Sequence, residues 1–442
     1  MSDGAFAGRS LHFIGIGGAG MSGLALVAHA LGARVTGSDQ AESSYCARLR
    51  AAGITPVIGH DAVNYPVGAE VVVSTAIPDD NPELSAARAT GATLLHRGEL
   101  LGQVSRLKRT IAVSGTHGKT TSASMAAHAL LECGREPAFL IGGELRTAGT
   151  NAAWGDGEWA VIEADESDRS FLELEREVAV ITNIELDHHS TYAGLGELRA
   201  AFAEFAAPAH TRVLGPGIQL EADSLSFGID DGDVRATRLE LTRGGSRFTV
   251  DGVPVVLRVP GRHNVLNALA ALAACRTAGV DPSQAAPALA SFTGASRRFE
   301  DHGTTATGAR VYDDYAHHPT EVRAALEAAR TLEPRRLVAC FQPHLYSRTR
   351  KLARPFGRAL ALADVVVVMD VYPARERAED FPGVSGLLVA TAAAEAAGGR
   401  PVWWLPRSDD AERMLSGELR DGDVLLTLGA GDVDQVARSL TR

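Results

Sequence analysis

Short apolar runs that end in glycine or polar residues recur along this chain, and residues with helical spacing follow each of them. Examples are "LHFIGI" at 11–16, "TIAVSG" at 110–115 and "VLLTLGAG" at 424–431. Strands that alternate with helices in this way form largely parallel sheets covered by helices. The sequence therefore predicts an α/β fold. In open parallel sheets, ligands bind at the carboxyl ends of the strands, so candidate functional residues are expected directly after the apolar runs.

The length of 442 residues is too great for one ordinary hydrophobic core, so we expect more than one domain. Two segments are typical of linkers or turns, the basic stretch "SRLKRT" and the stretch "FTGASRR". They predict three units, at 1–108, 109–296 and 297–442.

Composition excludes several classes of protein. The chain has 43 basic and 54 acidic residues, a formal charge of −11, and its arginines are scattered, which argues against a nucleic-acid partner. The four cysteines form no C-x-x-C pair, which argues against a zinc site or a disulfide framework and favours the reducing cytoplasm. The longest apolar runs are too short to cross a bilayer, so no membrane insertion is expected.

The stretch "FIGIGGAGMSG" carries the first chemical signal. Gly15, Gly17 and Gly20 give G-x-G-x-x-G between a predicted strand and a predicted helix, a turn that offers backbone N–H groups to a diphosphate. Asp39 ends the next apolar run, about where an acidic residue would meet a ribose hydroxyl. The motif indicates a nucleotide-binding site but does not identify the nucleotide. Two interpretations stay open here, a nicotinamide-dependent enzyme and a tight turn that binds no ligand.

The stretch "VSGTHGKTTSAS" is the stronger signal. The strict phosphate-loop pattern needs glycine where this chain has Val113, but G-T-x-G-K-T remains. Gly115 and Gly118 allow close backbone approach, Lys119 suits terminal phosphates, and Thr120 offers a hydroxyl to Mg²⁺. The alternative is an ordinary strand-to-helix turn. The pattern favours ATP over a redox cofactor.

Two polar clusters follow apolar runs in the same predicted unit, "EADESD" with Glu163 and "TNIELDHHS" with His188. Mg²⁺ prefers oxygen ligands and keeps several waters, so one carboxylate with Thr120 and phosphate oxygens suffices. Each residue by itself could be an ordinary polar side chain. Their position at strand ends beside a phosphate loop favours a role in phosphoryl transfer.

Nine motifs together resemble those of the Mur ligases, a family of ATP-dependent ligases of peptidoglycan synthesis. In chain order they are "HFIGIGGAGMSGLA", "GTHGKTT", "EADESD", "TNIELDH", "GRHNVLNALAA", "RRFE", "DDYAHHPTEV", "FQPHLYSRTR" and "LTLGAGD". The resemblance implies an N-terminal Rossmann-like domain for UDP-sugar and a central P-loop ATPase-like domain with a mixed or parallel sheet. A C-terminal Rossmann-like domain would close over ATP and the amino acid.

The first glycine motif is similar to that of the members that add L-alanine. For them the resemblance implies that the lactyl carboxylate of UDP-N-acetylmuramate attacks ATP, and that L-alanine then attacks the acyl phosphate. ADP and phosphate are released, two Mg²⁺ ions are expected, and the chain would be a monomer or weak homodimer. The alternative within the family is a ligase that joins a peptide or another amino acid to the same nucleotide sugar.

Two further classes of protein have less support. A nicotinamide oxidoreductase lacks support because no hydride-transfer constellation stands out. An inactive nucleotide-sugar sensor would require loss of Lys119, Thr120 or Glu163, and all three are present.

The resemblance also assigns residues. For the UDP-sugar they are Gly17, Gly18, Ala19, Gly20, Ser38, Asp39, His60, Ser74, Asn81 and Arg97. For ATP they are Gly115, Thr116, His117, Gly118, Lys119, Thr120, Thr121, His263, Asn264, Asn267, Arg298 and Asp314. For the amino acid they are Tyr315, His344 and Arg348, for metal Thr120, Glu163 and His188, and for catalysis Lys119, His188, His317, His344 and Arg348.

Some assignments keep a simpler alternative. Asn264 and Asn267 lie one helical turn apart and could cap a helix, and Asn81 could cap a loop. The chain also departs from several sister ligases, which use a carbamylated lysine in the central domain. Here no lysine occurs between Lys119 and Lys351, a departure that favours the alanine-adding members.

Overall fold

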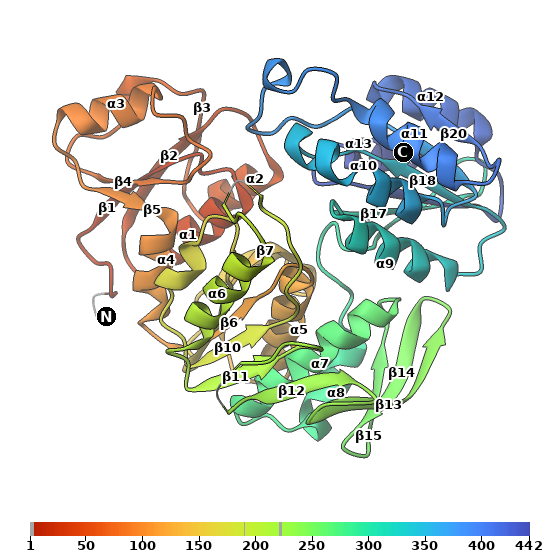
Figure 1. The fold of residues 1–442 in the computed structure, drawn as a ribbon. Coiled ribbons are helices and arrows are strands. Elements are labelled where there is room, and N and C mark those ends of the chain that lie inside the picture. Colours follow the sequence, from red (N-terminus) through yellow and green to blue (C-terminus); the bar gives the residue numbers. More distant parts are fainter. Residues whose placement is uncertain (1–3, 190, 221–222) are drawn as a thin grey trace. The chain divides into compact units, whose positions relative to one another are not determined.

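The computed structural model describes residues 4–189, 191–220 and 223–442. The described residues form three sheets of five, ten and six strands with helices around them, which confirms the predicted α/β fold (Figure 1). By internal packing the chain divides into two compact units. The first comprises Met1–Thr237, Thr249–Val255 and Leu266–Phe292, and the second Arg238–Phe248, Val256–Val265 and Thr293–Arg442. The division into three domains at 108 and 296 stays a prediction.

The first sheet of the first unit is parallel throughout, in the order β3-β2-β1-β4-β5. Its strands are β1 (Ser10–Ile14), β2 (Arg34–Asp39), β3 (Val57–Ile58), β4 (Glu70–Val73) and β5 (Leu94–His96). Its helices are α1 (Ala19–Ala30), α2 (Ser44–Ala51), η1 (Ala62–Asn64), α3 (Pro82–Ala89) and α4 (Arg97–Ser105). The strand order reverses between β1 and β4, the place where such sheets bind ligands.

The second sheet has the order β15-β14-β13-β12-β11-β10-β6-β9-β7-β8. Its strands are β6 (Arg109–Ser114), β7 (Ala138–Leu145), β8 (Thr150–Ala153), β9 (Trp159–Glu163), β10 (Val178–Ile181), β11 (Thr211–Leu214), β12 (Leu225–Ile229), β13 (Val234–Thr242), β14 (Gly245–Val250) and β15 (Val253–Leu257). Accompanying helices are α5 (Lys119–Glu132), η2 (Ser170–Glu173), α6 (Leu195–Ala206), α7 (Arg262–Thr277) and α8 (Pro282–Ser291). Strand β6 is parallel to both β9 and β10, so three carboxyl ends meet beside the loop before α5.

Within the first unit, the helix that follows the first glycine loop packs against strands of the second sheet. Helix α1 contacts β7 and β8. At this contact the buried Asn151 donates from Nδ2 to the carbonyl oxygen of Ala19 at 2.7 Å. The first turn of α1 is therefore tied to the second sheet.

The second unit holds the third sheet, in the order β16-β17-β21-β18-β19-β20. Its strands are β16 (Glu300–Thr304), β17 (Arg310–Asp314), β18 (Leu337–Phe341), β19 (Val365–Val368), β20 (Val402–Trp404) and β21 (Val424–Leu428). Its helices are α9 (Pro319–Arg330), α10 (Tyr346–Leu360), η3 (Ala378–Asp380), α11 (Gly386–Ala396), α12 (Ser408–Glu418) and α13 (Asp434–Leu440). Side chains of β18 alternate between two separate apolar cores, as expected for a strand covered on both faces. None of the described helices is long and apolar enough to cross a membrane.

Candidate active site

The loop between β6 and α5 depends on its two glycines. Gly115 has φ of 131° and Gly118 has φ of 80°, values that favour glycine. A Cβ at Gly115 would overlap the hydroxyl of Thr182, and one at Gly118 would overlap Oδ1 of Asn267. The backbone therefore approaches its surroundings as closely as a phosphate-binding loop requires.

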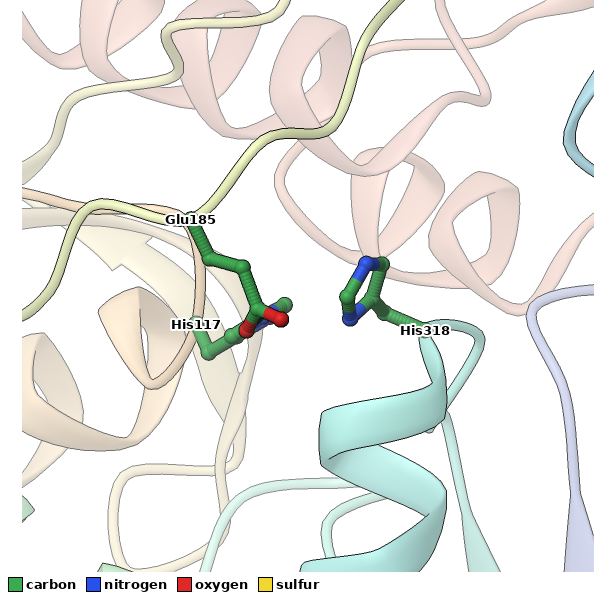
Figure 2. Close-up of side chains that lie close together, drawn as sticks. All are labelled: His117, Glu185 and His318. Atoms are coloured by element: carbon green, nitrogen blue, oxygen red, sulfur yellow. Dashed lines mark hydrogen bonds and ion pairs between the residues drawn. The ribbon is translucent and has the colours of Figure 1, made fainter. Parts of the chain in front are cut away.

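Asn183, which follows β10, supports this loop. Its carbonyl oxygen accepts from the Thr116 N–H at 3.0 Å, and its Oδ1 accepts from the His117 N–H at 2.9 Å. Its Nδ2 donates to the His117 carbonyl oxygen at 2.9 Å. The His117 ring lies beside Glu185, with Nε2 and Oε2 2.9 Å apart (Figure 2). The loop conformation is thus held by side chains from the neighbouring strand end.

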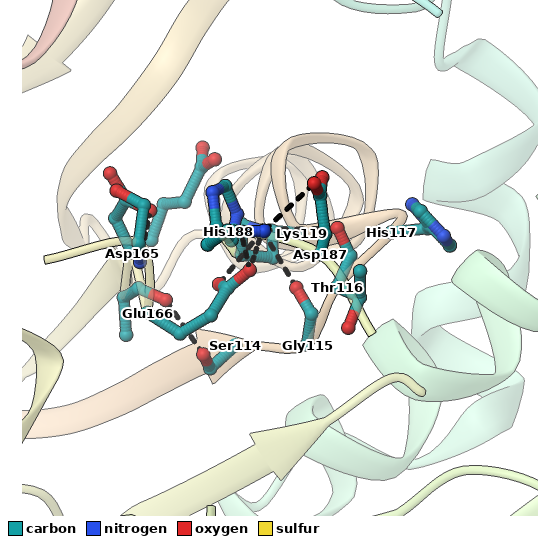
Figure 3. Close-up of polar contacts among 12 residues, drawn as sticks. Ser114, Gly115, Thr116, His117, Lys119, Asp165, Glu166, Asp187 and His188 are labelled. Carbon is teal, nitrogen blue, oxygen red and sulfur yellow. Dashed lines mark hydrogen bonds and ion pairs between the residues drawn. The ribbon is translucent and has the colours of Figure 1, made fainter. Parts of the chain in front are cut away.

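Lys119 lies at the centre of the site (Figure 3). Its Nζ donates to the Gly115 carbonyl oxygen at 2.7 Å and lies 2.9 Å from Oε2 of the fully buried Glu166. Burial lowers the pKa of Lys119, but Glu166, Asp165 and Glu163 outweigh burial and raise it. The lysine is therefore a charged ammonium group held beside the loop.

The hydroxyl of Thr120 donates to Oε1 of Glu163 at 2.9 Å, and the Gly142 N–H donates to Oε2 at 2.6 Å. A hydroxyl and a carboxylate at a helix N-terminus form an oxygen donor set that fits Mg²⁺. His188, the third predicted metal residue, lies beside Glu166, with Nε2 3.2 Å from Oε1 (Figure 3). Its imidazole nitrogen is a less usual ligand for that ion.

Arg97 joins the first sheet to this site. Its Nη2 lies 3.0 Å from Oδ2 of Asp165 and 2.9 Å from Oδ2 of Asp168. Burial raises the pKa of Asp165, but Arg97, Lys119 and His188 together hold it well below its usual range. A side chain at Gly20 would meet the Arg97 guanidinium, so this group lies between the two glycine loops.

The first glycine loop is held by Asp39 at the end of β2. Oδ2 of Asp39 accepts from the Gly17 N–H at 2.8 Å, and the Gly15 N–H donates to the Ser38 carbonyl oxygen at 2.8 Å. Gly18 precedes the first residue of α1, and Ala19 and Gly20 form its first turn. The loop thus places a helix N-terminus at the strand ends, where a diphosphate would bind.

The remaining first-sheet residues lie in two kinds of position. Ser38 and His60 share a buried partner, Glu83. Asn81 caps α3, with Oδ1 accepting from the Glu83 N–H at 2.9 Å, and Ser74 accepts from a neighbouring N–H. The Asn81 side chain therefore acts as a helix cap in this structure. Ligand binding by Asn81 and Ser74 stays a prediction.

Helix α7 contributes to both compact units. In the first unit Asn267 accepts from the Ser122 hydroxyl at 3.2 Å beside Gly118, and Thr121 lies in the first turn of α5. In the second unit Asn264 donates to the Pro260 carbonyl oxygen at 2.7 Å. Burial lowers the pKa of His263 to about 4, so that ring is neutral at neutral pH.

In the second unit Asp314 ends β17. It accepts from the backbone N–H groups of Phe299 and Ala316, each at 2.8 Å, and burial raises its pKa to about 6. The Arg298 guanidinium lies over the Tyr315 ring, 5.2 Å from its centre. The strand end therefore carries an aromatic ring and a cation next to a buried carboxyl group.

The predicted amino-acid residues lie together at the ends of β17 and β18. The rings of His317 and His344 have centres 5.9 Å apart, and Nη1 of Arg348 lies 3.1 Å from Nδ1 of His344. The ring of Tyr372 stacks on His344, a contact that the sequence analysis missed because a β-bridge from a distant segment creates it. A buried arginine among rings suits a carboxylate or phosphate ligand.

A lysine on a glycine loop, a hydroxyl beside a carboxylate and parallel strand ends together define an α/β enzyme that binds a nucleoside triphosphate. Sequence models of three Mur ligase domains match the chain in order. They are the Mur ligase family catalytic domain at residues 10–109, the Mur ligase middle domain at 113–275, and the Mur ligase glutamate ligase domain at 297–431. The chain belongs to the Mur ligase family, the ATP-dependent ligases of peptidoglycan synthesis.

The chain is similar over its length to curated relatives. It is 46% identical to the UDP-N-acetylmuramate--L-alanine ligase of Rubrobacter xylanophilus, covering 97% of this chain and 99% of the relative. It is 45% identical to the protein of the same name from Streptomyces coelicolor, covering 96% and 95%. The crystal structure of UDP-N-acetylmuramate-alanine ligase MurC from Thermotoga maritima has a TM-score of 0.85 at 32% identity, covering 98% of each chain. A murein peptide ligase from Psychrobacter arcticus has a TM-score of 0.75 at 25% identity, also covering 98% of each.

Proposed function

We propose that this chain joins L-alanine to the lactyl carboxylate of UDP-N-acetylmuramate, with ATP converted to ADP and phosphate. The observation that carries the proposal is the phosphate loop, in which Lys119 is a charged ammonium and Thr120 meets Glu163. The full-length relatives that bear this activity in their names support the same choice of substrates.

In the first step, a carboxylate oxygen of the nucleotide sugar attacks the γ-phosphorus of ATP. The new O–P bond forms as the bond to the β-phosphate oxygen breaks, giving an acyl phosphate and ADP. Phosphoryl transfer of this kind depends on positioning and on charge neutralisation. Lys119 neutralises the transferring group, and the N–H groups of the loop and of α5 orient it.

Thr120 and Glu163 would hold one Mg²⁺, and we assign His188 to a second. A bound Mg²⁺ supplies further neutralisation of phosphate charge. Glu166 orients both Lys119 and His188, since its Oε1 lies 3.1 Å from Nζ of the lysine and 3.2 Å from Nε2 of the histidine.

In the second step, the amine of L-alanine attacks the acyl carbonyl carbon, the amide bond forms and phosphate leaves. We assign Tyr315, His344 and Arg348 to the amino acid, with the guanidinium as partner of its carboxylate. The ammonium form must lose a proton before it attacks, and His317 or His344 would accept it. We assign the loop at 115–120 to ATP. The same assignment covers five further residues: Arg298, Asp314, His263, Asn264 and Asn267.

Release of phosphate from ATP tests the proposal. Turnover should require both UDP-N-acetylmuramate and L-alanine, and a murein peptide should not replace L-alanine. Phosphate release that follows a peptide and ignores alanine would assign the chain to the peptide-joining alternative. The alanine ligase is favoured because the Thermotoga maritima structure is the nearer of the two in both TM-score and identity.

We place the reaction in the cytoplasm. The four cysteines are free thiols, which fits a reducing compartment. The expected oligomeric state, a monomer or weak homodimer, stays a prediction that sedimentation measurements can test.

A further inference from the structure

A buried carboxylate, Glu83, lies at the start of α3 behind the predicted UDP-sugar residues of the first sheet. Its side chain is fully buried and receives four side-chain donors. His12 Nε2 and Ser38 Oγ each lie 2.7 Å from its oxygens, His60 Nδ1 lies at 3.0 Å and Asn64 Nδ2 at 3.2 Å. Of these donors, only Ser38 and His60 were singled out from the sequence.

These four donors fill the carboxylate, which has about four lone-pair positions. Burial raises the pKa of Glu83, but the hydrogen bonds from His12, Ser38, His60 and Asn64 outweigh burial and lower it to about 2. Glu83 is therefore an ionised acceptor at neutral pH, and each neighbour must present a proton to it.

This requirement determines the tautomer of His60. The single hydroxyl proton of Ser38 is directed at Glu83, whose oxygens lie 2.7 Å from Oγ. Nδ1 of His60 faces the oxygens of Glu83 and Ser38, each at 3.0 Å, so a bare lone pair there would face two oxygens. Nδ1 must carry the proton, and in the neutral ring Nε2 is then an acceptor.

His60 differs from the other histidine on the same carboxylate. The His60 side chain is 19% exposed and follows β3 at the carboxyl end of the sheet, where the Gly59 N–H donates to the Asp39 carbonyl oxygen at 2.8 Å. The His12 side chain is 1% exposed, and its second nitrogen already has a partner, the Thr36 hydroxyl at 2.9 Å. Only His60 can offer its outer nitrogen to a ligand at this edge.

We propose that Glu83 is a positioning residue for the nucleotide sugar. It holds His60 as the Nδ1–H tautomer, so that Nε2 accepts a hydrogen bond from an N–H or O–H group of the uridine or sugar. This inference rests on the proposed function, because it takes the first sheet to bind UDP-N-acetylmuramate.

The test compares Glu83→Gln with the matched control His12→Gln in the full chain. An amide has one acceptor oxygen and its own donors, so it cannot serve all four neighbours. Glu83→Gln should weaken UDP-N-acetylmuramate binding about tenfold or more by calorimetry and leave the affinity for ATP unchanged. His12→Gln disturbs the same buried network and should lower the melting temperature while keeping the nucleotide-sugar affinity within about twofold.

Two further readouts keep the inference testable if Glu83→Gln folds poorly. Nitrogen-15 spectra of the wild-type histidine rings, with His60 assigned through His60→Ala, should show the Nδ1–H tautomer. His60→Ala should lose about the same affinity as Glu83→Gln, and the double variant should lose little more. An Nε2–H tautomer in the wild type, or unchanged affinity in either single variant, would overturn the inference.

Failure of the proposed function has a different signature. A wild-type chain that turns over UDP-N-acetylmuramate and L-alanine, with a Glu83→Gln variant of unchanged KM for the sugar, contradicts the role of Glu83 alone. A wild-type chain that neither binds nor turns over the sugar contradicts the proposed function, and the spectra still report the tautomer.

Discussion

The two glycine loops of the first unit have the same local plan and different surroundings. Each follows a strand and leads into a helix, α1 after the loop at 15–20 and α5 after the loop at 115–120. The first is held by a carboxylate, Asp39, which accepts from the Gly17 N–H. The second has Lys119 as the first residue of its helix, and its supporting carboxylates meet that lysine and Thr120.

The difference separates holding a phosphate from transferring one. A diphosphate that only anchors a substrate needs backbone N–H groups at a helix N-terminus. A phosphoryl group in transfer spreads charge over its oxygens and needs a cation and metal ligands nearby. The chain therefore contains the same strand–glycine loop–helix arrangement twice. The side chains around each loop determine whether it only binds a phosphate or also supports phosphoryl transfer.

The largest effect is expected when Lys119, the lysine of the loop at 115–120, is removed. Lys119→Ala should lower kcat by about 1000-fold or more, because the transferring phosphoryl loses its neutralising ammonium. Binding of UDP-N-acetylmuramate should stay within about twofold, measured by calorimetry. Lys351→Ala, which removes an exposed lysine on α10, is the matched control and should leave kcat unchanged. Joint loss of turnover and sugar binding in Lys119→Ala would contradict the separation of the two loops.

Alanine in place of one glycine in each loop should give unequal losses. Gly118→Ala places a side chain at φ of 80° and into Asn267, so ATP affinity should fall by about 100-fold or more. Gly17→Ala puts a Cβ 3.0 Å from side-chain atoms of Asp39, Ser43 and Cys46, which can shift, so sugar affinity should fall only about tenfold. Calorimetry with each ligand measures both, and a loss of ATP affinity in Gly17→Ala would reverse the assignment.

The link between the loops should have a measurable coupling energy. Arg97 and Asp168 are 24% and 9% exposed, so a double-mutant cycle with Arg97→Gln and Asp168→Asn should give a coupling of about 1–3 kcal/mol in the free energy of unfolding. The exposed pair Arg88 and Asp79 is the matched control and should give about 0.5 kcal/mol or less. Equal coupling in the two cycles would mean that Arg97 adds no more than a surface ion pair.

The last expected effect is a pH dependence of stability at His263, which lies outside both loops. Burial lowers the pKa of His263 to about 4, from an ordinary value of 6.5. Between pH 6.5 and 4 the unfolded chain binds a proton that the folded chain does not, so stability falls as pH falls through this range. Melting temperatures measured across that range should fall less steeply for His263→Gln than for the wild type. Identical slopes would show that the ring titrates normally when folded.

The fold and the phosphate loop were predictable from the sequence because their signals are local. The apolar run, the glycines and the Lys119–Thr120 pair of the phosphate loop follow one another within a few residues. Glu163 ends another parallel strand, and the carboxyl ends of parallel strands lie at one edge of a sheet. The structure confirms the α/β class and places Thr120 against Glu163. The roles of these residues in binding and catalysis stay predictions.

The contacts that the motifs did not predict act across long separations in the sequence, and Glu83 and His12 were missed for this reason. Glu83 contacts His12 within β1 and His60 after β3, and Arg97 at the start of α4 reaches Asp165 after β9. No periodicity or short motif records such pairs, because they depend on how whole helices and sheets pack. Residues that orient a site are thus harder to find from sequence than residues that carry its chemistry.

The central claim is that the loop at 115–120 holds ATP and the loop at 15–20 holds the nucleotide sugar. A crystal structure of the full chain with a non-hydrolysable ATP analogue, Mg²⁺ and UDP-N-acetylmuramate tests it most directly. We expect the triphosphate at Lys119, with the metal on Thr120 and Glu163, and the UDP diphosphate at the N-terminus of α1. A triphosphate bound at Gly17 and Gly18, or a nucleotide sugar in the second loop, would contradict the account.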